Sequence, residues 1–181
     1  MDYYSKSGRQ PFFKLLLSGL LFMVFGNLLC TIVTVSTAPF MNFEFFKVIV
    51  FILTLIIFYS LMFTAGYRDG DREQKYVRLH KASKWVLIGI ILMAIMFVPS
   101  LLLLLDKLCG WYFDMTFVHR IIDGLVYPLS LMIVPENTID SMDIFVPFIY
   151  MLCYAGIPAA THLGYYFGYT QKFNKDDIMY Q

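Results

Sequence analysis

The chain has few charged residues, and none of them lies near the middle of its long apolar runs. Aspartate, glutamate, lysine and arginine make up only 15% of the 181 residues, and the formal net charge is +1. This balance excludes a nucleic-acid-binding protein, which would carry a strongly basic surface. Without an ionised side chain inside the runs, the spans also lack the usual basis for a proton relay or a sodium site.

Sequence motifs of catalysis and metal binding are missing as well. The chain has no His-Glu-x-x-His motif and no glycine-rich phosphate loop, and its three cysteines form no Cys-x-x-Cys pair. The apolar runs also contain no paired aspartates and no arrangement of serine and histidine suited to intramembrane proteolysis. We therefore expect a non-enzymatic protein with no metal and no cofactor.

Four long apolar runs are what the sequence does contain. Hydrophobic residues make up 59% of the chain, and the mean hydropathy is +0.67. Each run is long enough, at 1.5 Å per helical residue, to cross a hydrocarbon core about 30 Å thick. The runs predict an all-α fold, a four-transmembrane-helix bundle in one integral membrane domain, with spans at residues 15–37, 48–66, 85–105 and 144–167. Small residues at Ser36-Thr37-Ala38 also fit a signal-peptide cleavage site, but the run is long for one and Pro39 would follow the cut.

The distribution of lysine and arginine predicts how the chain is threaded. Eleven of the fourteen fall in residues 1–14, 68–84 and 168–181, whereas the outer segments hold only Lys47, Lys107 and Arg120. By the positive-inside rule, residues 1–14 and 168–181 are cytoplasmic tails and residues 68–84 are a cytoplasmic loop. We expect a plasma-membrane protein whose two termini are both cytoplasmic.

The two halves of the chain resemble each other. Lys14, Gly19 and Met23 recur with the same spacing as Lys84, Gly89 and Met93, and Gly66-Tyr67-x-x-Gly70 recurs as Gly164-Tyr165-x-x-Gly168. The pattern indicates two parallel helical-hairpin repeats. Matches this short also arise by chance in apolar sequence, so duplication and coincidence both stay open.

The second half is longer because of an outer loop at residues 106–143. Apolar residues recur there at helical spacing, at Val118, Ile121, Ile122, Leu125 and Leu129. Arg120 and Asp123 would have to enter lipid if this helix crossed the bilayer. The pattern favours an amphipathic interfacial helix along the outer leaflet over residues 117–134, with a fifth, tilted span or partial insertion as the alternative.

The fourth span carries a ridge of small residues. Gly156, Ala160, Gly164 and Gly168 recur every four residues, which allows another helix to approach closely. The partner helix could belong to this chain, to a second copy or to another membrane protein.

A second group of residues predicts a polar site. Asn27 falls near the middle of the first span, and Pro158 is expected to kink the fourth and to free the carbonyl of Tyr154. Together with Thr161 and His162, Asn27 and Tyr154 would line a polar cavity. The alternative is that these groups only bond neighbouring backbone.

Two stretches resemble a known kind of protein. They are Gly70-Asp71-Arg72-Glu73-Gln74-Lys75-Tyr76-Val77-Arg78-Leu79-His80, followed by Gly89 and Pro99, and the closing His162-Leu163-Gly164-Tyr165-Tyr166-Phe167-Gly168-Tyr169. They are similar to segments of uncharacterised small multi-pass membrane proteins of Gram-positive bacteria. No activity is assigned to that group, so the resemblance implies the fold alone.

These observations lead to two hypotheses for the function. The first is a structural or accessory subunit that packs, through the small-residue ridge, against other membrane proteins or itself. The second is a small permease or channel component whose pathway passes the polar residues of the fourth span.

Overall fold

The computed structural model describes residues 10–76, 83–110, 119, 122–134, 139 and 141–170. Over these residues the chain is helical, and four segments are long and apolar enough to cross a membrane, as the four runs predict. Only 28% to 33% of the residues in their most apolar windows are buried inside the protein. Most of this apolar surface therefore faces outward, as only a lipid solvent favours, and the chain is a multi-pass membrane protein.

The first hairpin consists of two continuous helices. α1 (Phe12–Thr37) is joined to α2 (Glu44–Tyr76) by a short connection that contains the 3₁₀ turn η1 (Ala38–Phe40). α2 extends well past residue 66, where the apolar run ends, and includes the first residues of the expected loop. The Asp71 carboxylate accepts a 3.0 Å hydrogen bond from the Lys75 ammonium on this polar extension, the i,i+4 pair that the spacing predicts.

The second hairpin is interrupted. α3 (Trp85–Cys109) ends at Gly110, which adopts the left-handed conformation with a φ of 62° that glycine tolerates. The outer segment then contains the short helix α5 (Tyr127–Ile133). The fourth span is split into α6 (Val146–Leu152) and α7 (Ile157–Thr170).

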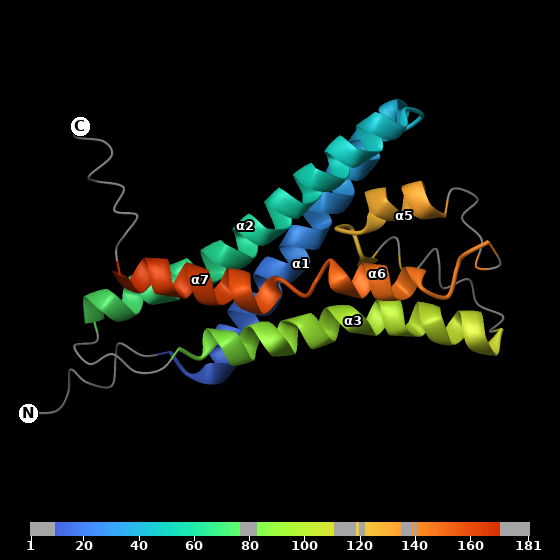
Figure 1. Ribbon diagram of the computed structural model, residues 1–181. Helices are drawn as coiled ribbons and strands as arrows, with labels where there is room; N and C mark the ends of the chain where they lie inside the picture. Colours follow the sequence, from blue (N-terminus) through green and yellow to red (C-terminus); the bar gives the residue numbers. More distant parts are fainter. Residues whose placement is uncertain are drawn as a thin grey trace, which may run out of the picture.

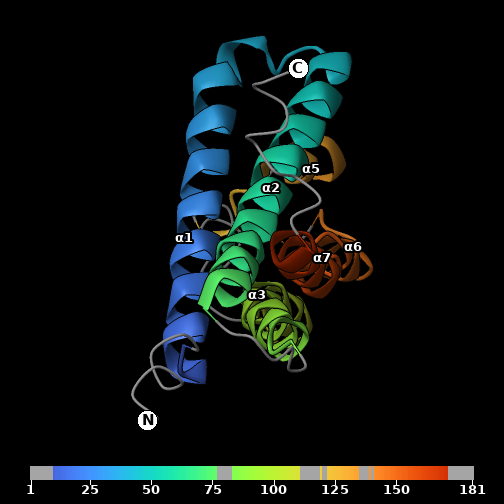
Figure 2. The same cartoon turned by 90° about the vertical axis from the view of Figure 1, so that its left-hand side faces the viewer.

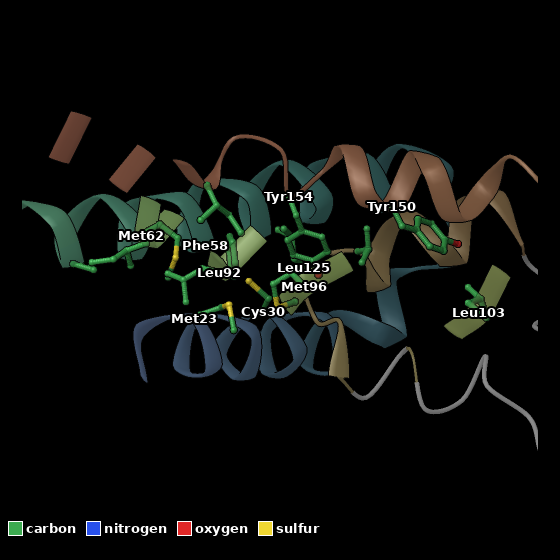
Figure 3. Packing of buried hydrophobic residues seen from close by; sticks show 14 of the residues in the cluster. Met23, Cys30, Phe58, Met62, Leu92, Met96, Leu103, Leu125, Tyr150 and Tyr154 are labelled. Carbon is green, nitrogen blue, oxygen red and sulfur yellow. The ribbon is translucent and has the colours of Figure 1, made fainter. Parts of the chain in front are cut away.

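The helices pack together at one end of the bundle and separate toward the other end (Figure 1). α7 packs between α2 and α3, and α1 packs against α2 and α3. At the end where α1 connects to α2, these two helices diverge from α3 and α6, and α5 lies between the two pairs. A single apolar core fills the interior, and its buried members include Met23, Cys30, Phe58, Met62, Leu92, Met96, Leu125 and Tyr154 (Figure 3).

The closest helix contact joins the two Gly-Tyr-x-x-Gly segments. A Cβ added to Gly66 would collide with the carbonyl of Thr161, and one added to Gly164 would collide with the carbonyl of Phe63. In both cases the collision is with the residue three positions before the partner glycine. Gly70 and Gly168 repeat the relation with Tyr165 and Tyr67, so α2 and α7 meet through a local two-fold relation. This contact also explains why α2 continues beyond the apolar run, since α7 packs along its extension.

Candidate functional site: a polar cluster inside the bundle

The outer segment enters the bundle between α1, α2 and α3. Asp123, Leu125 and Val126 are all 0% exposed. The backbone N–H of Leu125 donates to the Asn27 side-chain oxygen over 3.3 Å, and the Thr54 hydroxyl donates to the Leu125 carbonyl over 3.4 Å. Side chains from two helices thus satisfy the backbone of a non-helical stretch, which is the condition for such backbone to exist at membrane depth.

The contacts also give the depth of this insertion. Asn27 lies ten residues before the end of α1, and Thr54 lies ten residues after the start of α2. At 1.5 Å per residue both lie about 15 Å from the outer helix ends, near the middle of a hydrocarbon core. Leu125 therefore lies inside the bundle and not on a helix along its surface, and of the two placements expected for residues 117–134 partial insertion fits these contacts better. Val118, Arg120 and Ile121 lie outside the described residues.

Gly124 permits this close approach. A Cβ at this position would collide with the Asn27 carbonyl and with the backbone and hydroxyl of Thr31. The inserted chain therefore rests directly on the backbone of α1, and any larger residue would push it away.

The insertion brings an ionisable pair into the interior. The Nε2 atom of His119 lies 2.9 Å from an Asp123 carboxylate oxygen and 3.3 Å from the Ser100 hydroxyl of α3. The His119 ring stacks on Tyr150 of α6 with centroids 5.0 Å apart. His119 is only 4% exposed and Ser100 is 0% exposed, so the group is shielded on every side.

Asp123 and its neighbours form what we call the central polar cluster: Asn27, Ser100, His119, Asp123 and Tyr154. The Asp123 carboxylate and the Tyr154 hydroxyl are both buried, and they interact by a side-chain hydrogen bond as well as by charge. The carboxylate is thus enclosed by protein, with the His119 imidazole on one oxygen and the Tyr154 hydroxyl nearby.

Nucleophilic catalysis is not supported by this geometry, although a serine, a histidine and an aspartate meet. A nucleophile relay needs the serine on one imidazole nitrogen and the carboxylate on the other. Here both Ser100 and Asp123 contact Nε2. The cluster can hold and exchange a proton or stabilise a cation, but it does not arrange Ser100 for attack.

Two of the four residues predicted to line a polar site belong to this cluster, Asn27 and Tyr154. Thr161 instead joins α7 to α3, because its hydroxyl donates to the Trp85 carbonyl over 3.2 Å. His162 is partly buried, and its Nδ1 atom is buried without a hydrogen-bond partner. The structure places no contact between His162 and the cluster.

Contrary to the prediction from the sequence, Pro158 does not leave the Tyr154 carbonyl free. The fourth span breaks at residues 153–156, one turn before the proline. The Tyr154 carbonyl is not free, since it accepts a 3.1 Å bond from the Ile157 N–H, and the Tyr59 hydroxyl donates to the Cys153 carbonyl. Proline removes one donor, and the neighbouring helix replaces it.

The small-residue ridge is covered within the chain. Gly164 and Gly168 press against the backbone of α2, and Gly156 meets the Tyr59 side chain. Ala160, the fourth member, is partly buried in the same packing. This surface is therefore not open to another protein.

The sequence does not predict a site at His119, Asp123, Ser100 or Gly124. One signal was present, because His119 and Asp123 are four residues apart, and an i,i+4 spacing aligns an acid with a base. It pointed to a pair on a water-exposed helix face as readily as to a buried one. Only tertiary contacts decide between these placements.

Known metal-binding arrangements and known proteins add no further assignment. Within the described part of the chain, no three histidine, cysteine or acidic side chains are grouped to hold a metal ion. Comparisons with protein-family models, curated proteins and solved structures find no match to this chain.

Proposed function

We propose that this membrane protein is a small permease or channel component for protons or small cations, and that the His119–Asp123 pair handles the charge. One observation carries the proposal: a fully buried carboxylate, level with the middle of the first span, forms an ion pair with a histidine that is itself only 4% exposed. Removing a carboxylate from water costs several kcal/mol even after relaxation. Ionisable groups at this depth typically mark ion pathways or proton relays.

The identity of the pair favours protons as the first candidate. Imidazole is the side chain that gains or loses a proton most readily near neutral pH, and a carboxylate at 2.9 Å can accept that proton. The buried hydroxyl of Tyr154, which interacts with Asp123, supplies a further group that can donate or accept a hydrogen bond.

Buried polar side chains continue from the cluster toward the other end of the bundle. On the fourth span they are Tyr154, Thr161 and Tyr165, all 3% exposed or less. The Tyr165 hydroxyl donates to the Glu73 carboxylate of α2 over 2.6 Å. This series is the basis for a route from the cluster to the end of the bundle where α2 ends.

The rival role, a structural or accessory subunit, has lost its main support. It rested on an available small-residue ridge, and Gly164 and Gly168 are occupied by α2.

Proton flux in liposomes tests the proposal. Purified protein is reconstituted with a pH-sensitive dye inside the vesicles, and a potassium diffusion potential drives uptake. We expect flux in wild type and its loss in Asp123→Asn, because the amide retains the shape but cannot exchange a proton. Asp71→Asn, which removes a partly exposed carboxylate near the end of α2, should retain wild-type flux.

Two outcomes would reject the transport role. One is a folded Asp123→Asn variant whose flux equals that of wild type. The other is wild-type protein whose flux equals that of empty liposomes in both proton and sodium gradients. The second result, together with copurification of a stoichiometric partner, would restore the accessory-subunit hypothesis.

A further inference from the structure

A pocket lies at the end of the bundle remote from the inserted segment. It lies where α1 begins, α2 ends and α3 begins, and this end of the bundle faces the viewer in Figure 2. Its volume is about 280 Å³, and its polar wall contains Gln10, Ser18, Arg68, Asp69 and Arg72. Leu15, Ala65 and Trp85 supply the apolar wall. The pocket shares no residue with the central polar cluster.

The charged groups of this pocket are unequally engaged. Asp69 accepts a 2.9 Å hydrogen bond from the indole N–H of Trp85, which is 1% exposed. Arg68 rests over the Phe22 ring, 5.8 Å from its centroid. Neither Arg68 nor Arg72 forms an ion pair with another residue that the structure describes. The carboxylate is thus held by the protein, whereas both guanidinium groups keep donors to offer.

We propose that this pocket binds a phosphate group, and that its source is the headgroup of a membrane phospholipid. Arg68 and Arg72 are one helical turn apart and line the same pocket. Guanidinium groups match phosphate oxygens with two parallel hydrogen bonds, and the Ser18 hydroxyl is a further donor on the same wall.

Charge and position favour a phospholipid over free phosphate. Two arginines and one aspartate give the pocket a formal charge of +1. A phosphodiester carries one negative charge, whereas a phosphate monoester carries about 1.5 to 2 at neutral pH. Trp85 lies at the end of its span, where indole rings meet headgroups, and basic pockets between helix ends are known lipid sites.

Lipid retention and Trp85 fluorescence test this proposal in the full-length protein. Native mass spectrometry measures the phosphatidylglycerol that stays bound in detergent. We expect Arg68→Gln/Arg72→Gln to weaken retention on the order of tenfold, as the loss of two charge-assisted contacts implies. Lys75→Gln, which removes one positive charge at an exposed position of the same helix outside the pocket, should leave retention unchanged.

A second readout separates the two phosphate sources. In a Trp111→Phe background, Trp85 is the only tryptophan and its emission reports on the pocket. Phosphatidylglycerol in nanodiscs should shift the emission, and inorganic phosphate should neither shift it nor compete. Equal lipid retention in the double arginine variant would overturn the proposal, and a response to inorganic phosphate alone would overturn the headgroup assignment.

Discussion

The two hairpins share the packing of their second helices and differ at the outer end. In the first, α1 and α2 are continuous and joined by a short connection. In the second, 39 positions separate Leu105 from Ile144, and the returning helix is broken before α7. Residues from this longer connection deliver His119 and Asp123 to the interior. The polar cluster therefore lies where the second hairpin departs from the two-fold relation that α2 and α7 share.

The largest effect should come from breaking what the hairpins share. Gly164→Leu places a branched side chain against the Phe63 carbonyl, so α7 must separate from α2. We expect loss of the folded state, a cost above about 5 kcal/mol, the range reached only by severe single substitutions. Ala159→Leu, an exposed position on the same helix, should unfold like wild type in detergent denaturation.

The His119–Asp123 ion pair belongs to the second hairpin alone, and removing one partner tests its contribution to stability. His119→Leu leaves the Asp123 carboxylate buried without its partner, and such losses cost about 3–5 kcal/mol. The double variant His119→Leu/Asp123→Leu should recover most of this stability, because no charge is then buried alone. A double-mutant cycle in chemical denaturation measures the coupling. Additive effects of the two single changes would mean that the contact contributes nothing.

Gly124→Ala should weaken the insertion without disturbing the shared contact. Its Cβ meets the backbone of α1 at Asn27 and Thr31, so we expect a cost of about 1–3 kcal/mol, typical of overpacking, and reduced flux. Gly110→Asn is the matched control. No atom lies within 4 Å of a Cβ at Gly110, and asparagine tolerates its φ of 62°. Equal flux in both variants would contradict the role of the insertion.

The smallest effect is expected at Thr161. Thr161→Val removes the hydroxyl that donates to the Trp85 carbonyl and keeps the shape of the side chain. Interhelical hydrogen bonds in membranes contribute about 0.6 kcal/mol on average, so unfolding should shift only slightly. Thr64→Val removes an exposed hydroxyl bonded within its own helix and serves as the reference. A cost above about 2 kcal/mol would show that Thr161 does more than join α3 to α7.

Much of the fold follows from the sequence because spans are a property of local composition. The four apolar runs predict the four crossings, and the spacing of Asp71 and Lys75 predicts their ion pair. The Gly-Tyr-x-x-Gly match indicates related helix ends, although the sequence alone leaves open which helices meet. The resemblance to small bacterial membrane proteins stays a prediction, as does the cytoplasmic location of both termini.

The site could not be derived in the same way, because its residues meet only through tertiary contacts. Asp123 looked excluded from the membrane on the assumption that it would face lipid. In the structure it faces protein instead, with Asn27 and Thr54 bonding the backbone of Leu125, two residues farther along the chain. Hydropathy measures what a segment does alone in lipid and contains no term for a polar neighbour.

A thiol crosslink tests the insertion of the outer segment most directly. Cys30 of α1 and Leu125 belong to the same core (Figure 3) and both contact Thr54, because the Cys30 thiol donates to the Thr54 carbonyl and the Thr54 hydroxyl donates to the Leu125 carbonyl. Leu125→Cys in a Cys109→Ala/Cys153→Ala background therefore leaves two thiols on either side of Thr54. Oxidation in native membranes should join Cys30 to position 125, detected as a linked peptide by mass spectrometry, while Leu131→Cys on α5 should not link to Cys30. Absence of the Cys30 crosslink at position 125, with both thiols reactive after denaturation, would contradict the account.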